Sequence, residues 1–318
     1  MSGLHHHGHD HAHGEERSSL TARAAMASIV MALFLIGLKT WAAVHTSSMA
    51  MLGSLADSGL DLLASIVVLA GVRIAAMPAD TDHRFGHGKA EALAALVQVI
   101  LISLSALFIG YRSVGRLIAG EQTTDAELGI GVSIIAILFT FALITYQRHV
   151  VRRTGSVAIS TDRLHYASDL LLNTSVIVAL VLDQYAGLAG ADAAFGLIIA
   201  LWLLWGAWSS SSHALDQLMD REWPVELRTK FLAACAEYPE LAGLHDLRTR
   251  TSGTHNFAQF HVWVPADWTI AQAHERMDRI EEELQHRFPT TEILMHLDPE
   301  GHTDRETMLP PEITEKAS

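Results

Sequence analysis

The stretch LADSGLDLLAS, residues 55–65, places two aspartates four residues apart inside a run that otherwise has the composition of a membrane-spanning helix. Residues four apart lie on one face of an α-helix, so Asp57 and Asp61 project together. An aspartate at the centre of a bilayer helix costs about 2.5–3.5 kcal/mol, and such acids normally face a cavity or a partner. Two like charges this close cannot both stay ionised without a counter-cation. The pattern therefore predicts a membrane helix that binds a cation.

The composition of the whole chain also favours a membrane protein. Half of the 318 residues are hydrophobic, the mean hydropathy is +0.24 and only 18% of residues are charged, unlike an ordinary soluble enzyme. Apolar runs recur at about the 20-residue length that a helix needs to cross the hydrocarbon core. Six spans are predicted, at residues 22–44, 48–76, 90–118, 128–147, 161–183 and 189–212.

Charge predicts how the spans are oriented. The connections after the second and fourth spans are rich in arginine and lysine, whereas those after the first and fifth have neither. By the positive-inside rule, the even-numbered connections and both termini are cytoplasmic. The first span is predicted to remain as an anchor, because no cleavage site follows a short apolar core.

Four regions follow from these patterns. The predicted regions are a histidine-rich, disordered N-terminal tail (1–19), a six-helix membrane domain (20–215), a cytoplasmic α/β domain (216–300) and a flexible C-terminal tail (301–318). The N-terminal histidines predict metal buffering, with a cloning tag as the alternative. From residue 216 onward the chain has 20 acidic and 10 basic residues, a balance that repels nucleic acid and attracts cations.

The α/β domain is predicted from alternating and helical periods. The expected order αββαβ resembles metallochaperone-like folds, with helices at 224–238 and 269–288 and strands at 245–251, 255–264 and 292–297.

The fifth span carries ligands that match the opening acids. In DRLHYASDLLLN, residues 162–173, His165 and Asp169 are again four apart, and Asn173 extends the same face. Together with the two aspartates of the second span they offer a complete first shell for a tetrahedral divalent cation. The single cysteine, Cys235, excludes a thiolate cluster. The alternative is a set of polar residues that hydrogen-bond between helices, but two such pairs on different spans favour a metal.

A second group of candidate ligands lies between spans two and three. In PADTDHRFGHGKAEA, residues 78–92, the spacing of Asp80, His83 and His87 suits a metal, and Asp82 is an equally good candidate. The alternative is a solvated loop whose histidines cap helices or meet lipid headgroups.

Taken in order, these motifs resemble the cation diffusion facilitator family, in particular its bacterial ferrous-iron and zinc efflux branch. The resemblance covers residues 20–298 and rests on DSGLD at 57–61, HYASD at 165–169, DHRFGHGKAE at 82–91 and HDLRTR at 245–250. It implies a homodimeric divalent-metal/proton antiporter in the bilayer of the bacterial inner membrane.

The resemblance also implies the roles of individual residues. The implied transport site is Asp57, Asp61, His165 and Asp169, the loop site is Asp80, His83 and His87, and the cytoplasmic site is His245, His261, His274, His296 and Asp298. A salt bridge between the membrane and cytoplasmic domains maps onto Lys89 and Asp220. This chain departs from relatives at Leu297, where a polar side chain can occur, and zinc-selective relatives have a histidine in place of Asp57.

The predicted function is transport by alternating access. A cytoplasmic cation binds deprotonated ligands and displaces their protons, and protons rebind on the outer side. Histidine, with an unperturbed pKa of about 6.5, suits this exchange, which points to His165. The donor set suits Zn²⁺ first, and also Fe²⁺, Cd²⁺, Mn²⁺ or Co²⁺, whereas Mg²⁺ and Ca²⁺ prefer all-oxygen shells.

Two other classes of protein compete with this interpretation. A passive metal channel or a membrane-bound metal sensor would keep the sites without proton coupling. An enzyme is not expected, because no HExxH helix and no separate general base accompany an open metal position.

Overall fold

The computed structural model describes residues 8–46, 49–119, 127–186, 190–253 and 255–300. Contacts divide the chain into two units, which are described separately. The larger unit is Arg17–Leu215, and the other comprises Met1–Glu16 and Asp216–Ser318.

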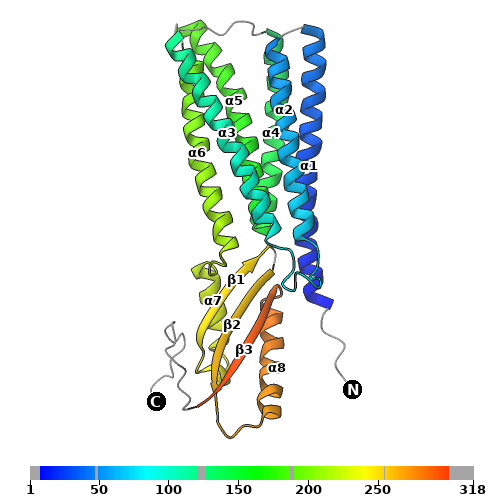
Figure 1. Cartoon of the computed structure of the whole chain (residues 1–318), viewed down its shortest axis with the longest axis vertical. Coiled ribbons are helices and arrows are strands. Elements are labelled where there is room, and N and C mark those ends of the chain that lie inside the picture. Colours follow the sequence, from blue (N-terminus) through cyan, green and yellow to red (C-terminus); the bar gives the residue numbers. More distant parts are fainter. Residues whose placement is uncertain (1–7, 47–48, 120–126, 187–189, 254, 301–318) are drawn as a thin grey trace. The chain divides into compact units, whose positions relative to one another are not determined.

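Six long helices that run side by side form the larger unit (Figure 1). They are α1 (Gly8–Thr46), α2 (Met49–Ala75), α3 (Ala90–Ala119), α4 (Glu127–Thr154), α5 (Val157–Ala186) and α6 (Ala191–Leu218). Within the described residues, five of them contain a segment long and apolar enough to cross a membrane, and α5 is the exception. The helical membrane domain is therefore confirmed. In the described part of α5, polar residues such as Asp162, His165 and Asp169 keep the hydropathy below that of such a segment.

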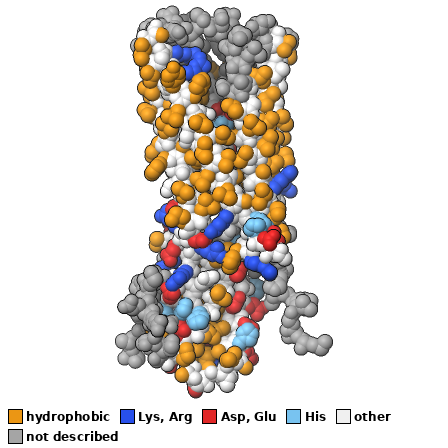
Figure 2. Space-filling model, viewed as in Figure 1, with side chains coloured by type: hydrophobic (Ala, Val, Ile, Leu, Met, Phe, Trp, Pro, Cys, Tyr) orange, Lys and Arg blue, Asp and Glu red, His pale blue; other side chains and the backbone are white. Residues whose placement is uncertain are grey.

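Hydrophobic side chains cover the outside of these helices (Figure 2). Leu104 and Phe108 of α3 and Trp205 of α6 are examples of large apolar groups that are more than half exposed. Such a surface suits contact with lipid rather than water.

Small residues allow the helices to approach closely inside the bundle. α2 and α3 pack at Gly71, where a methyl group would overlap the Cβ of Ala94 and lie 3.1 Å from the carbonyl oxygen of Ala90. Ala24 of α1, Val68 of α2, Val150 of α4 and Ile159 of α5 belong to one buried cluster, and residues of α3 and α6 form another. The bundle thus has the small-residue contacts that membrane helices need in order to pack.

The N-terminal boundary differs from the prediction. α1 begins at Gly8, so residues 8–19 of the tail predicted to be disordered are helical. This part of the chain contains no proline, and a helix can therefore continue backward from the apolar span without losing a backbone hydrogen bond. Residues 1–7 and the predicted C-terminal tail, 301–318, lie outside the described residues.

The C-terminal unit has the predicted order αββαβ. Its elements are α7 (Val225–Cys235), the short 3₁₀ helix η1 (Pro239–Leu241), β1 (His245–Ser252), β2 (His255–Val264), α8 (Ile270–Arg287) and β3 (Thr291–Pro299). The sheet order is β1-β2-β3, with β1 antiparallel and β3 parallel to the central β2. Thr269 starts α8 with a capping box, because its hydroxyl accepts from the backbone of Gln272 while its own N–H donates to the Gln272 side chain.

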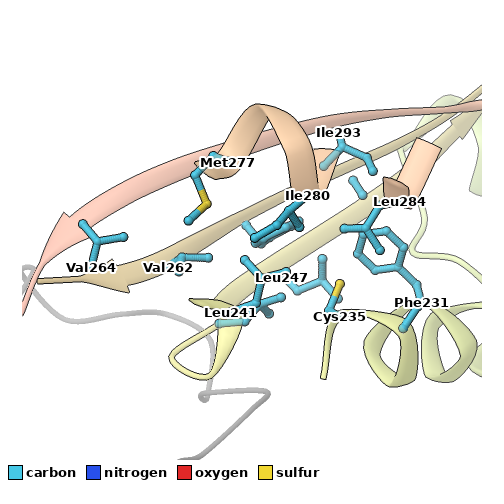
Figure 3. Close-up of a cluster of buried hydrophobic side chains, with 14 of the residues drawn as sticks. Phe231, Cys235, Leu241, Leu247, Val262, Val264, Met277, Ile280, Leu284 and Ile293 are labelled. Atoms are coloured by element: carbon cyan, nitrogen blue, oxygen red, sulfur yellow. The ribbon is translucent and has the colours of Figure 1, made fainter. Parts of the chain in front are cut away.

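One face of the sheet packs against α7 and α8 (Figure 3). Phe231, Leu247, Ile280 and Leu284 are among the buried side chains of this core. Cys235 lies in the same core, and burial raises the pKa of its thiol to about 12. The thiol therefore stays protonated at neutral pH.

The close approach at Gly71 gives a stability prediction. Gly71→Ala should lower the free energy of unfolding by about 1–3 kcal/mol, because the added methyl group forces α2 away from α3. The control is Gly115→Ala on α3, where an added Cβ meets no heavy atom within 4 Å. Thermal unfolding of both variants in detergent checks this. Equal melting temperatures would show that the α2–α3 contact tolerates the methyl group.

Candidate metal centres

The first candidate centre lies between α2 and α5 inside the membrane domain. His165 Nε2 is 2.9 Å from Asp61 Oδ1, and each residue is only 9% exposed. Asp169, one turn further along α5, joins them, and one ligand atom from each of the three lies within 4.8 Å of the others. The helical spacing that pairs His165 with Asp169 thus directs both side chains at α2.

The other two residues of the predicted face are Asp57 and Asn173. Asp57 lies on α2, one turn before Asp61, but its side chain is outside the described part of the structure. Asn173 donates its side-chain amide to the backbone oxygen of Asp169 at 2.7 Å, and so acts within α5.

The position of α5 is fixed by a buried polar network that the sequence analysis did not identify. The carboxylate of Asp162, which is 0% exposed, accepts from Gln98 Nε2 at 2.8 Å and from Gln147 Nε2 at 2.7 Å. Ser28 Oγ donates to it at 2.5 Å and accepts from Gln147 at 3.0 Å. This network, here called the Asp162 hub, joins α1, α3, α4 and α5. Its signal in the sequence was one more acid within DRLHYASD and single glutamines in apolar spans.

Further contacts hold α5 on either side of the hub. Tyr166 donates to the backbone oxygen of Ser28 at 2.9 Å, and its hydroxyl is 3.0 Å from that of Ser65 on α2. At the first turn of α5, buried Glu91 of α3 accepts a hydrogen bond from Ser156. These contacts leave His165 and Asp169 facing Asp61.

The three predicted loop residues, Asp80, His83 and His87, lie close together between α2 and α3. Asp80 Oδ2 is 3.3 Å from His87 Nε2, and Asp80 Oδ1 is 3.4 Å from His83 Nδ1. Gly86, with φ of 76°, allows the turn that brings the two imidazoles together. Asp82 contributes its backbone N–H to Asp80 Oδ1 at 2.9 Å and its carboxylate is no member of the cluster.

The protonation states at the loop suit a cation. The backbone N–H of His83 donates to Asp80 at 2.6 Å and is the main cause that lowers the pKa of this carboxyl group. His87 Nδ1 is 3.2 Å from the carbonyl oxygen of Pro78, so Nδ1 carries the proton and Nε2 presents a lone pair. The loop therefore offers a carboxylate and an oriented imidazole, half open to water.

The third centre lies on the sheet face that α7 and α8 do not cover. Asp298 Oδ2 is 2.9 Å from His261 Nδ1 and 3.5 Å from His245 Nε2, and the three residues come from three adjacent strands. His245 and His261 are partners in the β1–β2 register, as are His261 and His296 in the β2–β3 register. His296 Nε2 lies 3.4 Å from Asp298 Oδ1. His245 Nδ1 is 2.9 Å from the Gly243 oxygen, which leaves its Nε2 for a cation.

Strand alternation explains the departure at Leu297. Successive side chains of a strand point to opposite faces, so Leu297 packs against the hydrophobic core while its neighbours His296 and Asp298 face the cluster. A leucine there removes no ligand from this centre.

The remaining predicted residues are the ligand His274 and the salt-bridge pair Lys89 and Asp220. His274 is exposed on α8, with Nδ1 3.2 Å from Asp278 Oδ1, and its role as a ligand stays a prediction. Asp220 lies 3.5 Å from Arg250 inside the C-terminal unit, whereas Lys89 belongs to the other unit. The salt bridge between Lys89 and Asp220 therefore also stays a prediction.

Comparisons with known proteins agree with both units. The family model of the cation efflux transmembrane domain matches residues 25–219, and that of the cation efflux protein cytoplasmic domain matches residues 223–300. The cation-efflux pump FieF of Salmonella arizonae is 41% identical over 287 residues, 90% of this chain and 95% of the relative. FieF of Serratia proteamaculans is 41% identical over 280 residues, 88% of this chain and 93% of the relative. A solved structure of CzrB in its zinc form is 31% identical and covers 27% of this chain and 99% of that chain, with a TM-score of 0.24.

The geometry of the sheet centre predicts different effects for two histidines. The test uses a background in which Asp61→Ala and Asp80→Ala disable the other two centres. In this background, His261→Ala should weaken Zn²⁺ binding by more than about 100-fold, because loss of a residue that only supports a ligand already costs roughly 10–100-fold. His274→Ala is the control and should bind Zn²⁺ as the background does, if one chain builds the centre. Titration calorimetry measures both affinities. A loss in His274→Ala as large as in His261→Ala would instead place His274 among the ligands.

Proposed function

Because the chain belongs to the cation diffusion facilitator family of cation efflux proteins, we propose that it exports a divalent transition-metal cation in exchange for protons. It is a multi-pass membrane protein whose relatives are transporters. The observation that carries the proposal is the cluster of Asp61, His165 and Asp169 between α2 and α5.

The donors of this cluster favour a transition-metal cargo. Carboxylate and imidazole groups suit Zn²⁺, Fe²⁺, Cd²⁺, Mn²⁺ and Co²⁺, whereas Mg²⁺ and Ca²⁺ prefer shells made of oxygen alone. Asp57, one turn from Asp61 on the same helix, is the proposed fourth ligand of a tetrahedral site. Zn²⁺ is the first candidate, because it takes four ligands of this kind most readily.

Proton coupling follows from the identity of the atoms that would coordinate the cation. At 2.9 Å, His165 Nε2 and Asp61 Oδ1 share a proton when no metal is bound. A cation that binds these same two atoms must displace that proton, because both ligands coordinate in their deprotonated forms. Metal and proton thus compete for one place, and alternating access to it from the two sides would couple their movements in opposite directions.

The remaining parts of the proposal concern assembly and the other two centres. We place the protein in the inner membrane of a bacterial cell, because the similar efflux pumps are bacterial. We place both termini in the cytoplasm on the basis of the arginine-rich even-numbered connections. The protein is proposed to be a homodimer, and the loop and sheet centres are proposed to bind metal on the cytoplasmic side. The rival proposal is a passive channel or a sensor, which would lack proton counterflow.

Removal of a ligand gives the first functional prediction. Asp61→Ala or Asp169→Ala should reduce Zn²⁺ flux into proteoliposomes by more than about 100-fold, because each loses a charged ligand of the cluster. Asp82→Ala, an exposed acid of the same unit, is the control and should keep its flux. Near wild-type flux in a folded Asp61→Ala protein would refute the site assignment.

The second functional prediction separates an antiporter from a channel. In oriented proteoliposomes, a lower pH on the loading side should weaken metal uptake, because protons compete for Asp61 and His165 before the metal binds. A lower pH on the releasing side should speed turnover, because protons there displace the metal. His165→Asp, which keeps an oxygen ligand but removes the imidazole, should change this dependence. Equal responses on both sides, without proton movement, would indicate a channel.

A further inference from the structure

We propose that Asp162 is a second proton-carrying carboxylate of the exchange cycle, which releases its proton when a divalent cation binds at the neighbouring site. The inference rests on the proposed function and adds a residue to it. Asp162 precedes His165 by three residues, about 4.5 Å along the axis of α5, toward the helix end that is predicted to be cytoplasmic.

The first support is the uncompensated charge of Asp162. The side chain is 0% exposed, and its three hydrogen-bond donors come from Ser28, Gln98 and Gln147, all of which are uncharged. An ionised carboxylate without a cation is costly inside a membrane protein, so a cation or a proton is needed to neutralise it. A proton fits better than a metal cation, because the groups that face the carboxylate present O–H and N–H donors and no further ligand.

The second support is the pair of glutamines. Each donates its side-chain N–H to Asp162, and the other amide atom of each, Oε1, is buried with no hydrogen-bond partner among the described residues. When a glutamine amide rotates by half a turn, its NH₂ group and its oxygen swap positions. In one orientation Gln98 and Gln147 donate to the carboxylate, and in the other an Oε1 atom accepts from the carboxylic acid. The hub can therefore offer Asp162 a hydrogen-bond partner in both protonation states.

The third support is the surroundings of the hub. The electrostatic partners of Asp162 on its own helix are His165 and Tyr166, while α1, α3 and α4 face it with the uncharged Ser28, Gln98 and Gln147. A divalent cation that binds His165, Asp61 and Asp169 replaces the proton between His165 and Asp61, and so raises the charge of the site by one unit about one turn from Asp162. This charge favours the carboxylate. The O–H bond of the acid breaks, its electron pair stays on Asp162 and the proton passes to cytoplasmic water.

Glu91, the other buried carboxylate between α3 and α5, lacks these features. Its partners are the hydroxyl group of Ser156 and the backbone N–H of Ala158 at the first turn of α5. A backbone N–H cannot turn into an acceptor, and a helix N-terminus favours a negative charge. Glu91 is therefore a matched control for Asp162.

The experiment counts the protons released when metal binds. Purified protein in weak buffer with a pH-indicator dye is saturated with Zn²⁺, and the count is divided by the number of protein chains, with the bound metal measured in parallel. At equal bound metal, Asp162→Asn should release one proton fewer per chain than the wild type, and Glu91→Gln should release the wild-type number. Equal release by Asp162→Asn and the wild type would overturn the role of Asp162 and leave the antiport proposal standing. No release by the wild type would overturn both.

A second measurement does not depend on the folding of Asp162→Asn. The infrared difference spectrum between metal-free and Zn²⁺-bound wild type should show the loss of a carboxylic-acid C=O band. In Gln147→Leu this band should appear at a different frequency, because Asp162 has lost one hydrogen-bond partner. A band at an unchanged frequency in Gln147→Leu, or no band at all in the wild type, would overturn the proposal.

Discussion

The hydrogen bond between His165 and Asp61 is the contact on which the membrane domain depends. An acid and an imidazole in an apolar helix bundle must satisfy each other or a cation, since lipid offers neither water nor counter-charge. Meeting this requirement places polar residues along one face of α5, and it fixes which faces of α2 and α5 meet. The polar face of α5 is therefore the one that carries the site, together with Asp61 of α2.

The same types of ligand are brought together by two different kinds of secondary structure in this chain, a helix and a sheet. In the membrane domain the 3.6-residue helical period places His165 and Asp169 on one face of a single helix. In the C-terminal unit the ligands come from three strands, and the register between strands places His245, His261 and Asp298 side by side. A helix can supply two ligands from one short motif, whereas the sheet gathers them from separate strands, with His245 and Asp298 lying 53 positions apart in the sequence.

These rules explain what could be predicted from the sequence and what could not. Periodicity gave the order of the elements and the pairing of His165 with Asp169, because both are local properties of the chain. The Asp162 hub was missed because Gln98 and Gln147 acquire meaning only when three other helices surround α5. Likewise, α8 covers the sheet face opposite the histidine cluster, so His274 does not join that cluster within one chain. No local pattern in the sequence indicates which face α8 covers. The helical start of α1 at Gly8 was hidden by a composition that is typical of disorder.

The hub also bears on how binding and movement are connected. Gln98 of α3 and Glu91, two turns earlier on the same helix, both contact α5, while α3 packs tightly on α2 at Gly71. The helix that carries Asp61 is therefore linked to the helix that carries His165 through α3 as well as through the site itself. A change in the protonation of Asp162 turns a glutamine amide over and alters the contact between α3 and α5. The charge at the transport site and the packing of its two helices are then controlled by the same few hydrogen bonds, which is the physical condition for coupling ion exchange to a change in access.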